Sequence, residues 1–165
     1  MLRRAPLLLL EKPEDAFELQ PVPAALIVDL EGTLVPFSPS PLLVIEAVGE
    51  FDEVARRNGF DVRRIQYITN ADLKELTAKG TRISARIHSN AHKPFFMPPR
   101  QFGHHRRGGL IVGDQYLTDG LLAWRFGFSF GLVRSRWPQP VWPRLQLSVG
   151  RALSAAFFRP ADQSG

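Results

Sequence analysis

The stretch ALIVDLEGTLVP, residues 25–36, decides how the rest of this chain is interpreted. It opens on an apolar run with the length of a buried strand. The run ends at two carboxylates, Asp29 and Glu31, followed directly by Gly-Thr. Buried strands commonly end in small turn residues such as glycine, proline or serine. Two acids at the tip of such a strand therefore need either partners or a chemical role.

Apolar runs of this kind alternate with helical patterns along most of the chain. The predicted strands cover residues 24–28, 65–68, roughly 82–87, 109–112 and 129–133. A helix is expected over residues 41–58, and a shorter helix should begin at the Asn70 cap and run to Lys79. This order is typical of an α/β protein with a Rossmann-like open parallel sheet and flanking helices.

Composition changes where the stretch RSRWPQPVWPR begins. We expect residues 1–133 to form the main domain and residues 134–165 to form a basic aromatic tail that leaves the sheet and contains an amphipathic helix. Within the tail, Leu145, Val149 and Leu153 recur at helical spacing, which is the pattern of a helix lying on a membrane surface. An equally open alternative is that the tail packs on the sheet, with Trp137, Trp142, Phe157 and Phe158 as ordinary packing residues.

Charge and cysteine content narrow the classes of partner and cofactor. The chain has 165 residues, a net charge of +5 and no cysteine. Positive charge favours nucleic acid, anionic lipid or phosphorylated small molecules. Without cysteine, a metal must be held by oxygen or imidazole, and a reducing cytoplasm suits the chain. Because no segment approaches the roughly 18 apolar residues of a membrane span, we expect a cytoplasmic protein, or one peripheral at the inner face of the membrane.

Polar residues follow the predicted strands at the points where the strands end. They are Asp29 and Glu31 after the first strand, Thr69 and Asn70 after the second, Lys93 in the loop after the third, and Asp114 and Asp119 after the fourth. In open α/β sheets, ligands bind at the carboxyl ends of the strands. We therefore expect these residues to meet in one site.

The acidic residues have the chemistry that phosphoryl transfer to a carboxylate requires. A carboxylate beside Mg²⁺ can attack a phosphoryl group, because the metal and a lysine neutralise the phosphate oxygens. We expect Asp29 to be the nucleophile, and Glu31 to protonate the leaving oxygen and later activate water. Asp114 and Asp119 are expected to hold Mg²⁺, which prefers a few carboxylates and water. Asp29 and Glu31 complete the expected metal ligands.

The remaining polar residues suit the phosphate itself. Thr69 and Asn70, with backbone amides at the start of the next helix, are expected to bind phosphate oxygens, and Lys93 is expected to add a fixed positive charge. A purely structural role is open for two of them, because Thr69 and Asn70 are also common helix caps.

Four stretches together resemble a known family. VDLEGTL, YITNAD, HKP and IVGDQYLTDGLLAWRFG, in this order and spacing, resemble the motifs of the haloacid dehalogenase superfamily of aspartate-nucleophile phosphatases. The resemblance covers roughly residues 24–133. Its most specific part is GDQYLTD followed by Ala123, Arg125 and Gly127, which looks like the small branch that includes phosphatidylglycerophosphate phosphatases. The resemblance implies a haloacid dehalogenase-like catalytic domain over residues 1–133 and a Mg²⁺-dependent phosphomonoesterase with an aspartyl-phosphate intermediate.

The length of the connecting segments bears on the substrate. Residues 34–67 and 69–93 leave no room for a cap domain beside the expected helices and strands, so we expect an open site. An open site suits a phosphate presented by something large. The preferred substrate is phosphatidylglycerophosphate or a similar anionic lipid phosphate, with the tail touching the bilayer. The alternatives are a soluble or nucleic-acid phosphate, and a binding protein that lost turnover because Glu31 stands where the family has aspartate.

Overall fold

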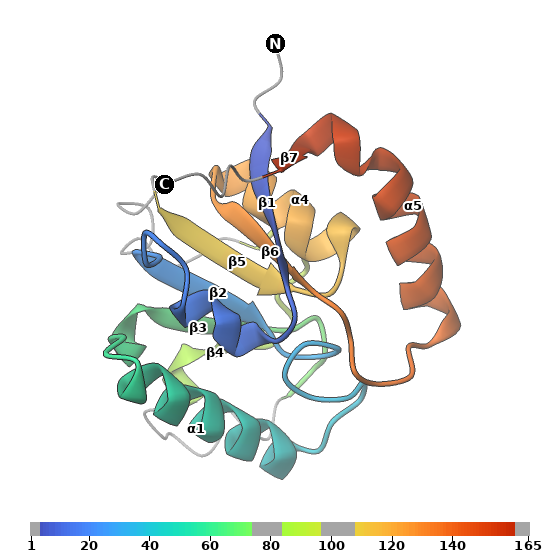
Figure 1. The fold of residues 1–165 in the computed structure, drawn as a ribbon. Helices are drawn as coiled ribbons and strands as arrows, with labels where there is room; N and C mark the ends of the chain where they lie inside the picture. The colour runs from blue at the N-terminus through green and yellow to red at the C-terminus, as the bar shows by residue number, and fades with distance from the viewer. Residues whose placement is uncertain (1–3, 74–83, 97–107, 161–165) are drawn as a thin grey trace.

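A single parallel sheet organises the protein, seen here in a computed structural model that describes residues 4–73, 84–96 and 108–160 (Figure 1). The strands are β1 (Ala5–Leu10), β2 (Ala25–Asp29), β3 (Ile65–Ile68), β4 (Ile87–His88), β5 (Gly109–Gly113), β6 (Ser129–Val133) and β7 (Phe158–Pro160). They form a seven-stranded sheet in the order β4-β3-β2-β5-β6-β1-β7, with all pairs parallel. The predicted α/β class with a Rossmann-like parallel sheet is therefore confirmed.

Helices flank this sheet. The α-helices are α1 (Pro41–Arg57), α4 (Leu121–Phe126) and α5 (Val141–Phe157); the short helical turns are η1 (Pro13–Phe17), η2 (Val62–Arg64), η3 (Ser84–Arg86) and η4 (Tyr116–Gly120). Helix α1 agrees with the helix predicted over residues 41–58. Ser40 caps its start, because its side-chain oxygen accepts a hydrogen bond from the Leu43 amide at 3.3 Å. In Figure 1, α1 lies on one side of the sheet, whereas α4 and α5 lie on the other.

The residues of β2 supply both halves of the core. Successive side chains of a strand point to opposite faces of the sheet. Leu26 and Val28 accordingly pack in the cluster that contains the buried side chains of α1, while Ala25 and Ile27 pack in the cluster that contains those of α4. A strand buried on both faces holds its tip firmly, which positions Asp29 at the end of β2.

The connections between strands create a crevice beside that tip. Strands β3 and β4 extend the sheet on one side of β2, and β5 and β6 extend it on the other. Counted from β2, this is the order 3-2-1-4-5 of doubly wound folds. The direction of strand addition reverses between β2 and β5, and such folds bind ligands outside the carboxyl ends of strands at this point. Strand β2 ends at the predicted site residue Asp29, and β5 ends directly before the predicted site residue Asp114.

The last two strands on one side of the sheet, β1 and the edge strand β7, were not expected from the sequence. Strand β1 pairs with β6, and β7 pairs with β1, both in parallel. After β6 the chain leaves the sheet and forms the expected tail helix α5, but it then returns to the sheet as β7, which was not predicted from the sequence. The unbroken leucines of β1 show no alternation that would mark a strand.

Two further predictions need correction. In place of a strand over residues 82–87, the described part has the turn η3 followed by β4, which is only Ile87–His88. Residues 71–73 are not helical, although a helix was expected from Asn70, and the rest of that expected helix lies outside the described residues. Among the helices of the described ranges, none has the length and apolar character needed to cross a membrane.

Helix α5 contacts the protein through one face and exposes apolar side chains on the other. Gly150 is buried, and a Cβ added there would lie 2.5 Å from the Cβ of Tyr116 in η4. Leu145, Val149 and Leu153 are 52%, 44% and 47% exposed. The apolar face that these three side chains form is open to solvent, whereas Phe157 and Phe158, at the end of the same segment, pack against the core as the alternative interpretation predicted.

Candidate active site

Three aspartates and one lysine meet at the carboxyl ends of the central strands. Asp29 is the last residue of β2, Asp114 follows β5, and Asp119 lies in η4. One carboxylate oxygen from each aspartate lies within 4.8 Å of the others, and all three side chains are buried. We call these three residues, together with Lys93, the acidic centre.

Lys93 links two of the carboxylates. Its Nζ donates hydrogen bonds to Asp29 Oδ1 at 2.6 Å and to Asp119 Oδ1 at 2.7 Å, and the lysine side chain is only 5% exposed. The Lys93 amide donates to Asn70 Oδ1 at 2.8 Å, so Asn70 holds the loop that carries the lysine. The structure thus brings together the predicted nucleophile, lysine and metal-binding aspartates.

Two glycines let the backbone approach these carboxylates. Gly32 has a φ of 82°, and a Cβ added there would lie 2.4 Å from Asp114 Oδ2. A Cβ on Gly113 would lie 2.4 Å from the carboxyl carbon of Asp119. Any other residue at either position would collide with an acid of the centre, so both glycines have a steric reason beyond turn formation.

Burial and crowding of like charges shift the acid–base properties of the centre. Burial, followed by repulsion from Asp119, raises the pKa of Asp29 well above its ordinary value, while Lys93 acts in the opposite direction. Burial and the same neighbour raise the pKa of Asp114 to about 7. Although burial favours its neutral form, Asp119 and Asp29 raise the pKa of Lys93, so the ammonium persists. Three carboxylates therefore share a single positive charge.

This imbalance fits a divalent cation. Asp114 Oδ1 is buried and has no hydrogen-bond partner among the described residues, so it offers a ligand atom. Carboxylate oxygens are the ligands that Mg²⁺ prefers, usually with several water molecules, and the chain has no cysteine to favour a softer metal. Asp29, Asp114 and Asp119 are the residues that could hold such an ion.

Glu31 is not a member of the group that the three aspartates form, whose oxygens meet within 4.8 Å in the described part of the chain. Its part in metal binding stays a prediction. Its Oε2 accepts a hydrogen bond from Thr69 Oγ1 at 2.8 Å, and its Oε1 accepts one from the Ser38 amide at 2.9 Å. Thr69 Oγ1 in turn accepts from the Ala71 amide at 3.1 Å. The glutamate is thus held in one orientation beside the predicted phosphate-binding residues.

Sequence reasoning missed two amide side chains that contact the centre. Gln139 Nε2 donates to Asp114 Oδ2 at 2.8 Å, and Gln115 contributes a weaker contact to the same oxygen at 3.4 Å. The backbone amide of Gln115 also donates a hydrogen bond to Asp119 Oδ2 at 3.2 Å. Gln115 could have been found, because it lies inside the quoted string GDQYLTD. Nothing in the sequence signals Gln139, whose position depends on how the chain runs between β6 and α5.

The arrangement is chemically suited to nucleophilic attack by a carboxylate on an electrophile that carries negative charge. A buried carboxylate beside an ammonium, with further acids that can hold a cation, has the components of this chemistry. Comparison of the chain with models of known protein families, with curated proteins and with solved structures finds no match. The argument for function therefore depends on the residues of the site.

Proposed function

We propose that the protein is a Mg²⁺-dependent phosphomonoester hydrolase of the haloacid dehalogenase type, without a cap domain, that acts on phosphatidylglycerophosphate or a similar anionic lipid phosphate. The observation that carries the proposal is the acidic centre, in which three buried aspartates and Lys93 meet at the switch point of a doubly wound sheet. The order of the four motifs that supply these residues agrees with the family resemblance.

In the first half of the proposed reaction, a carboxylate oxygen of Asp29 attacks the phosphorus atom, and the bond from phosphorus to the leaving oxygen breaks. Lys93 Nζ lies 2.6 Å from Asp29 Oδ1 and orients this nucleophile. Its positive charge also offsets the negative charge of the phosphate oxygens that approach the site. Mg²⁺ held by Asp29, Asp114 and Asp119 would supply the further positive charge that a phosphate dianion requires beside three carboxylates.

Glu31 is the proposed general acid and base. It gives a proton to the leaving oxygen and later takes a proton from the water that attacks the aspartyl phosphate, which releases inorganic phosphate and restores Asp29. The hydrogen bonds that Glu31 accepts from Thr69 Oγ1 and the Ser38 amide support this role, because they fix the longer side chain. The same contacts argue against the alternative of a binding protein with a damaged catalytic position.

Two features favour a lipid as the carrier of the phosphate. The described segment between β2 and β3 contains a short loop, α1 and η2, so nothing there has the size of a cap. Helix α5 exposes the apolar side chains of Leu145, Val149 and Leu153, and a helix with such a face and flanking arginines can lie at the surface of an anionic membrane.

The activity is tested by phosphate release from para-nitrophenyl phosphate and from phosphatidylglycerophosphate in mixed micelles, with Mg²⁺ or with EDTA. We expect turnover that requires Mg²⁺ and is lost in Asp29→Asn, because an amide cannot form the acyl phosphate. Activity that persists in EDTA, or in the Asn variant, would remove the basis of the proposal.

The membrane contact is tested by co-sedimentation with vesicles of phosphatidylcholine and phosphatidylglycerol. The double variant Leu145→Gln, Val149→Gln should bind less than the wild type, whereas Leu42→Gln, a change at a 65% exposed leucine of α1, should bind equally. Equal binding by all three proteins would leave a soluble or nucleic-acid phosphate as the substrate.

A further inference from the structure

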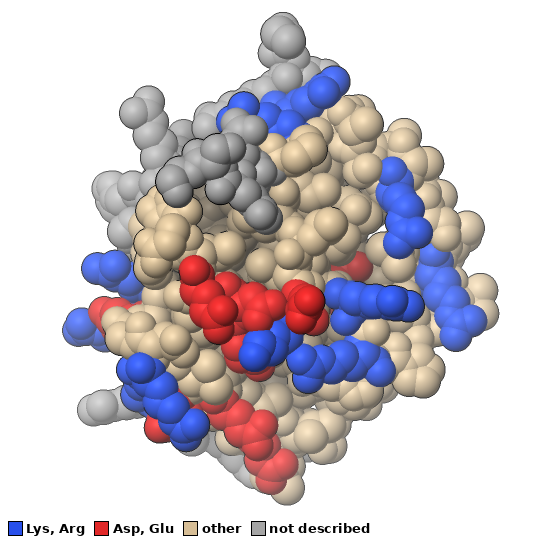
Figure 2. Space-filling view, in the orientation of Figure 1, with Lys and Arg blue, Asp and Glu red and all other residues tan. Residues whose placement is uncertain are grey.

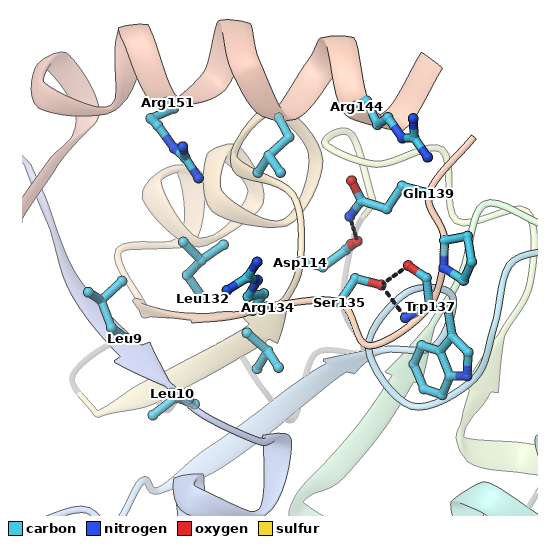
Figure 3. Close-up of a pocket in the computed structure, with 13 residues that line it drawn as sticks. Leu9, Leu10, Asp114, Leu132, Arg134, Ser135, Trp137, Gln139, Arg144 and Arg151 are labelled. Carbon is cyan, nitrogen blue, oxygen red and sulfur yellow. Dashed lines mark hydrogen bonds between the residues drawn. The ribbon is translucent and has the colours of Figure 1, made fainter. Parts of the chain in front are cut away.

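A cavity of about 760 Å³ opens beside the acidic centre, between α5 and the carboxyl ends of β1 and β6 (Figure 3). Its lining comprises Leu9, Leu10, Asp114, Leu132, Val133, Arg134, Ser135, Trp137, Pro138, Gln139, Arg144, Leu147 and Arg151. Asp114 is the member that the cavity shares with the acidic centre. A group bound at the Asp114 end of the cavity would therefore lie next to a phosphate bound at that centre.

Three arginines give the cavity its charge. Arg134 follows β6, and Arg144 and Arg151 lie on α5, separated by seven residues, which is close to two helical turns and brings them to one side of the helix. Figure 3 shows Arg151 reaching from α5 toward the sheet, with Arg134 across the same space. Within the described chain, none of these guanidinium groups forms an ion pair with an acidic side chain. They are free to bind an anion.

The positive charge extends over this side of the molecule. Figure 2 shows basic side chains along α5 and on the adjoining part of the same face, beside an acidic group in the middle of the view. Arginine is well suited to phosphate because its planar fork of donors matches two phosphate oxygens at once. These basic side chains line the cavity with positive charge, whereas the surface acids in the middle of Figure 2 are distinct from the buried aspartates of the acidic centre.

Apart from the arginines, Asp114, Ser135 and Gln139, the lining is apolar. Leu132 and Leu147 are half-buried in it, and Leu9 is 74% exposed although it lies on a strand of the sheet. An exposed leucine beside unpaired arginines offers a surface for a carbon chain that adjoins an anionic group. A fully polar ligand such as a sugar phosphate would leave this part of the wall without a contact.

We propose that this cavity binds a second anionic group of the substrate, a phosphodiester, together with the first carbon atoms of an attached acyl chain. The proposal rests on the proposed function, because it assumes that the phosphomonoester of the same molecule occupies the acidic centre. Arg134, Arg144 and Arg151 then act as specificity residues that select substrates with two phosphates. Leu9 and its apolar neighbours select those with a hydrocarbon part.

The first test compares two substrates. For wild type, Arg134→Gln, Arg151→Gln and the double variant, kcat/KM is measured on para-nitrophenyl phosphate, which has one phosphate, and on dihexanoyl phosphatidylglycerophosphate below its micelle concentration. A charge-assisted hydrogen bond contributes enough for roughly a ten- to hundredfold change in affinity. The ratio of the two kcat/KM values should fall by about tenfold in each single variant and further in the double variant.

A matched control is Arg64→Gln, because Arg64 is exposed in η2 before β3, at the opposite edge of the sheet. Its ratio should equal that of the wild type. Equal ratios in all variants would overturn the proposal, as would equal losses in Arg64→Gln and Arg151→Gln, which would indicate a general effect of net charge.

The second test does not need catalysis. Dihexanoyl phosphatidylglycerol has the diester and acyl chains without the phosphomonoester, and glycerophosphoglycerol has the diester alone. Calorimetric titration should show weaker binding of both by Arg151→Gln, and weaker binding of only the acylated compound by Leu9→Asn. If the protein hydrolyses no phosphomonoester but these differences hold, the proposed function fails and the cavity assignment stands. If neither compound binds the wild type, the cavity assignment fails.

Discussion

In the part of the chain that the structure describes, two buried clusters of charged side chains differ in their balance of charge. In the first, Asp52 of α1 accepts a hydrogen bond from Tyr67 Oη at 2.7 Å and another from Arg86 Nη1 at 3.0 Å. The second nitrogen of the same guanidinium contacts the other oxygen of Asp52. One carboxylate meets one guanidinium, and both carboxylate oxygens have donors. We call Asp52, Tyr67 and Arg86 the balanced cluster.

The acidic centre differs in that three carboxylates share one ammonium and that, within residues 4–73, 84–96 and 108–160, an oxygen of Asp114 has no donor. Burial does not distinguish the two clusters, because Asp52 is 1% exposed and Asp29 is 2% exposed. A buried charge without compensation lowers stability, and proteins keep such groups chiefly at functional sites. The comparison teaches that the uncompensated charge, more than burial, points to function.

Asp29→Asn should show the largest difference between the two clusters, because it should abolish turnover without lowering stability. We expect phosphate release to fall by something on the order of 10⁴-fold or more, the scale seen when a nucleophile is removed. The melting temperature without metal should not fall, because the amide has the same shape and one excess negative charge is gone. The control is Asp52→Asn, which should keep its turnover and lose stability. The reverse pattern would exchange the roles assigned to the two clusters.

Glu31 borders the acidic centre, and its variants test whether its two hydrogen bonds serve catalysis. Glu31→Gln should lower turnover by roughly 10² to 10⁴-fold, because it cannot transfer the proton. Glu31→Asp should lower turnover by about 10²-fold, because the shorter side chain withdraws the carboxyl group by about 1 Å. Steady-state rates on one phosphomonoester at saturating Mg²⁺ provide the measurement. A gain of turnover in the Asp variant would support the alternative of a damaged catalytic position.

The balanced cluster should matter for stability alone. Arg86→Met leaves Asp52 buried without its cation, which should lower the free energy of unfolding by about 3 to 5 kcal/mol. Urea denaturation of the metal-free protein measures this loss, and kcat at a temperature where the variant is folded should equal that of the wild type. Asp119→Asn is the counterpart in the acidic centre, and we expect it to lose turnover without losing stability. An Arg86→Met protein as stable as the wild type would mean that the ion pair is unimportant.

The smallest expected effect is on stability as a function of pH. The pKa of Asp114 is raised to about 7 from an ordinary value of 3.8, and that of Asp29 is raised as well, so the folded state binds these protons more tightly than the unfolded state. The resulting stability is present below about pH 4 and is lost as the pH rises through about 7. Mg²⁺ competes with the same protons.

The difference in melting temperature between samples with Mg²⁺ and with EDTA should therefore grow as the pH rises from about 5 to about 8. Saturating ligand can contribute about 2 to 4 kcal/mol to stability, which sets the scale. Differential scanning calorimetry of the wild type and of Asp114→Asn measures the effect, and the variant should have the flatter profile. A Mg²⁺ effect that is largest at low pH would place the cation away from Asp114.

The acidic centre was largely predictable from sequence because its members lie at the ends of apolar strands. Parallel strands bring their carboxyl ends to one edge, so Asp29 and Asp114 had to meet if both strands were assigned correctly. The position of Glu31 was less predictable. Its side chain is held by a hydrogen bond from Thr69 Oγ1, a residue 38 positions away in the chain, which no local pattern specifies.

The cavity and the sheet edge could not be predicted in the same way. Strand β7 and Gln139 take their places only because α5 packs closely on η4 through Gly150, a contact between segments far apart in the sequence. A helix pattern indicates which side chains share a face, but not which face is buried. The structure shows that the apolar stripe of α5 is the exposed one, which is the reverse of the usual arrangement.

The central claim is that Asp29 carries the phosphoryl group during turnover. Its most direct test is to quench the Mg²⁺-loaded protein during turnover of para-nitrophenyl phosphate and to treat it with sodium borohydride, which reduces an acyl phosphate to an alcohol. Peptide mass spectrometry should then find homoserine in place of Asp29 in the wild type, and should find Asp114 and Asp119 unchanged. Reduction at another carboxylate, or turnover with no reduced residue under conditions that trap acyl phosphates, would contradict the account.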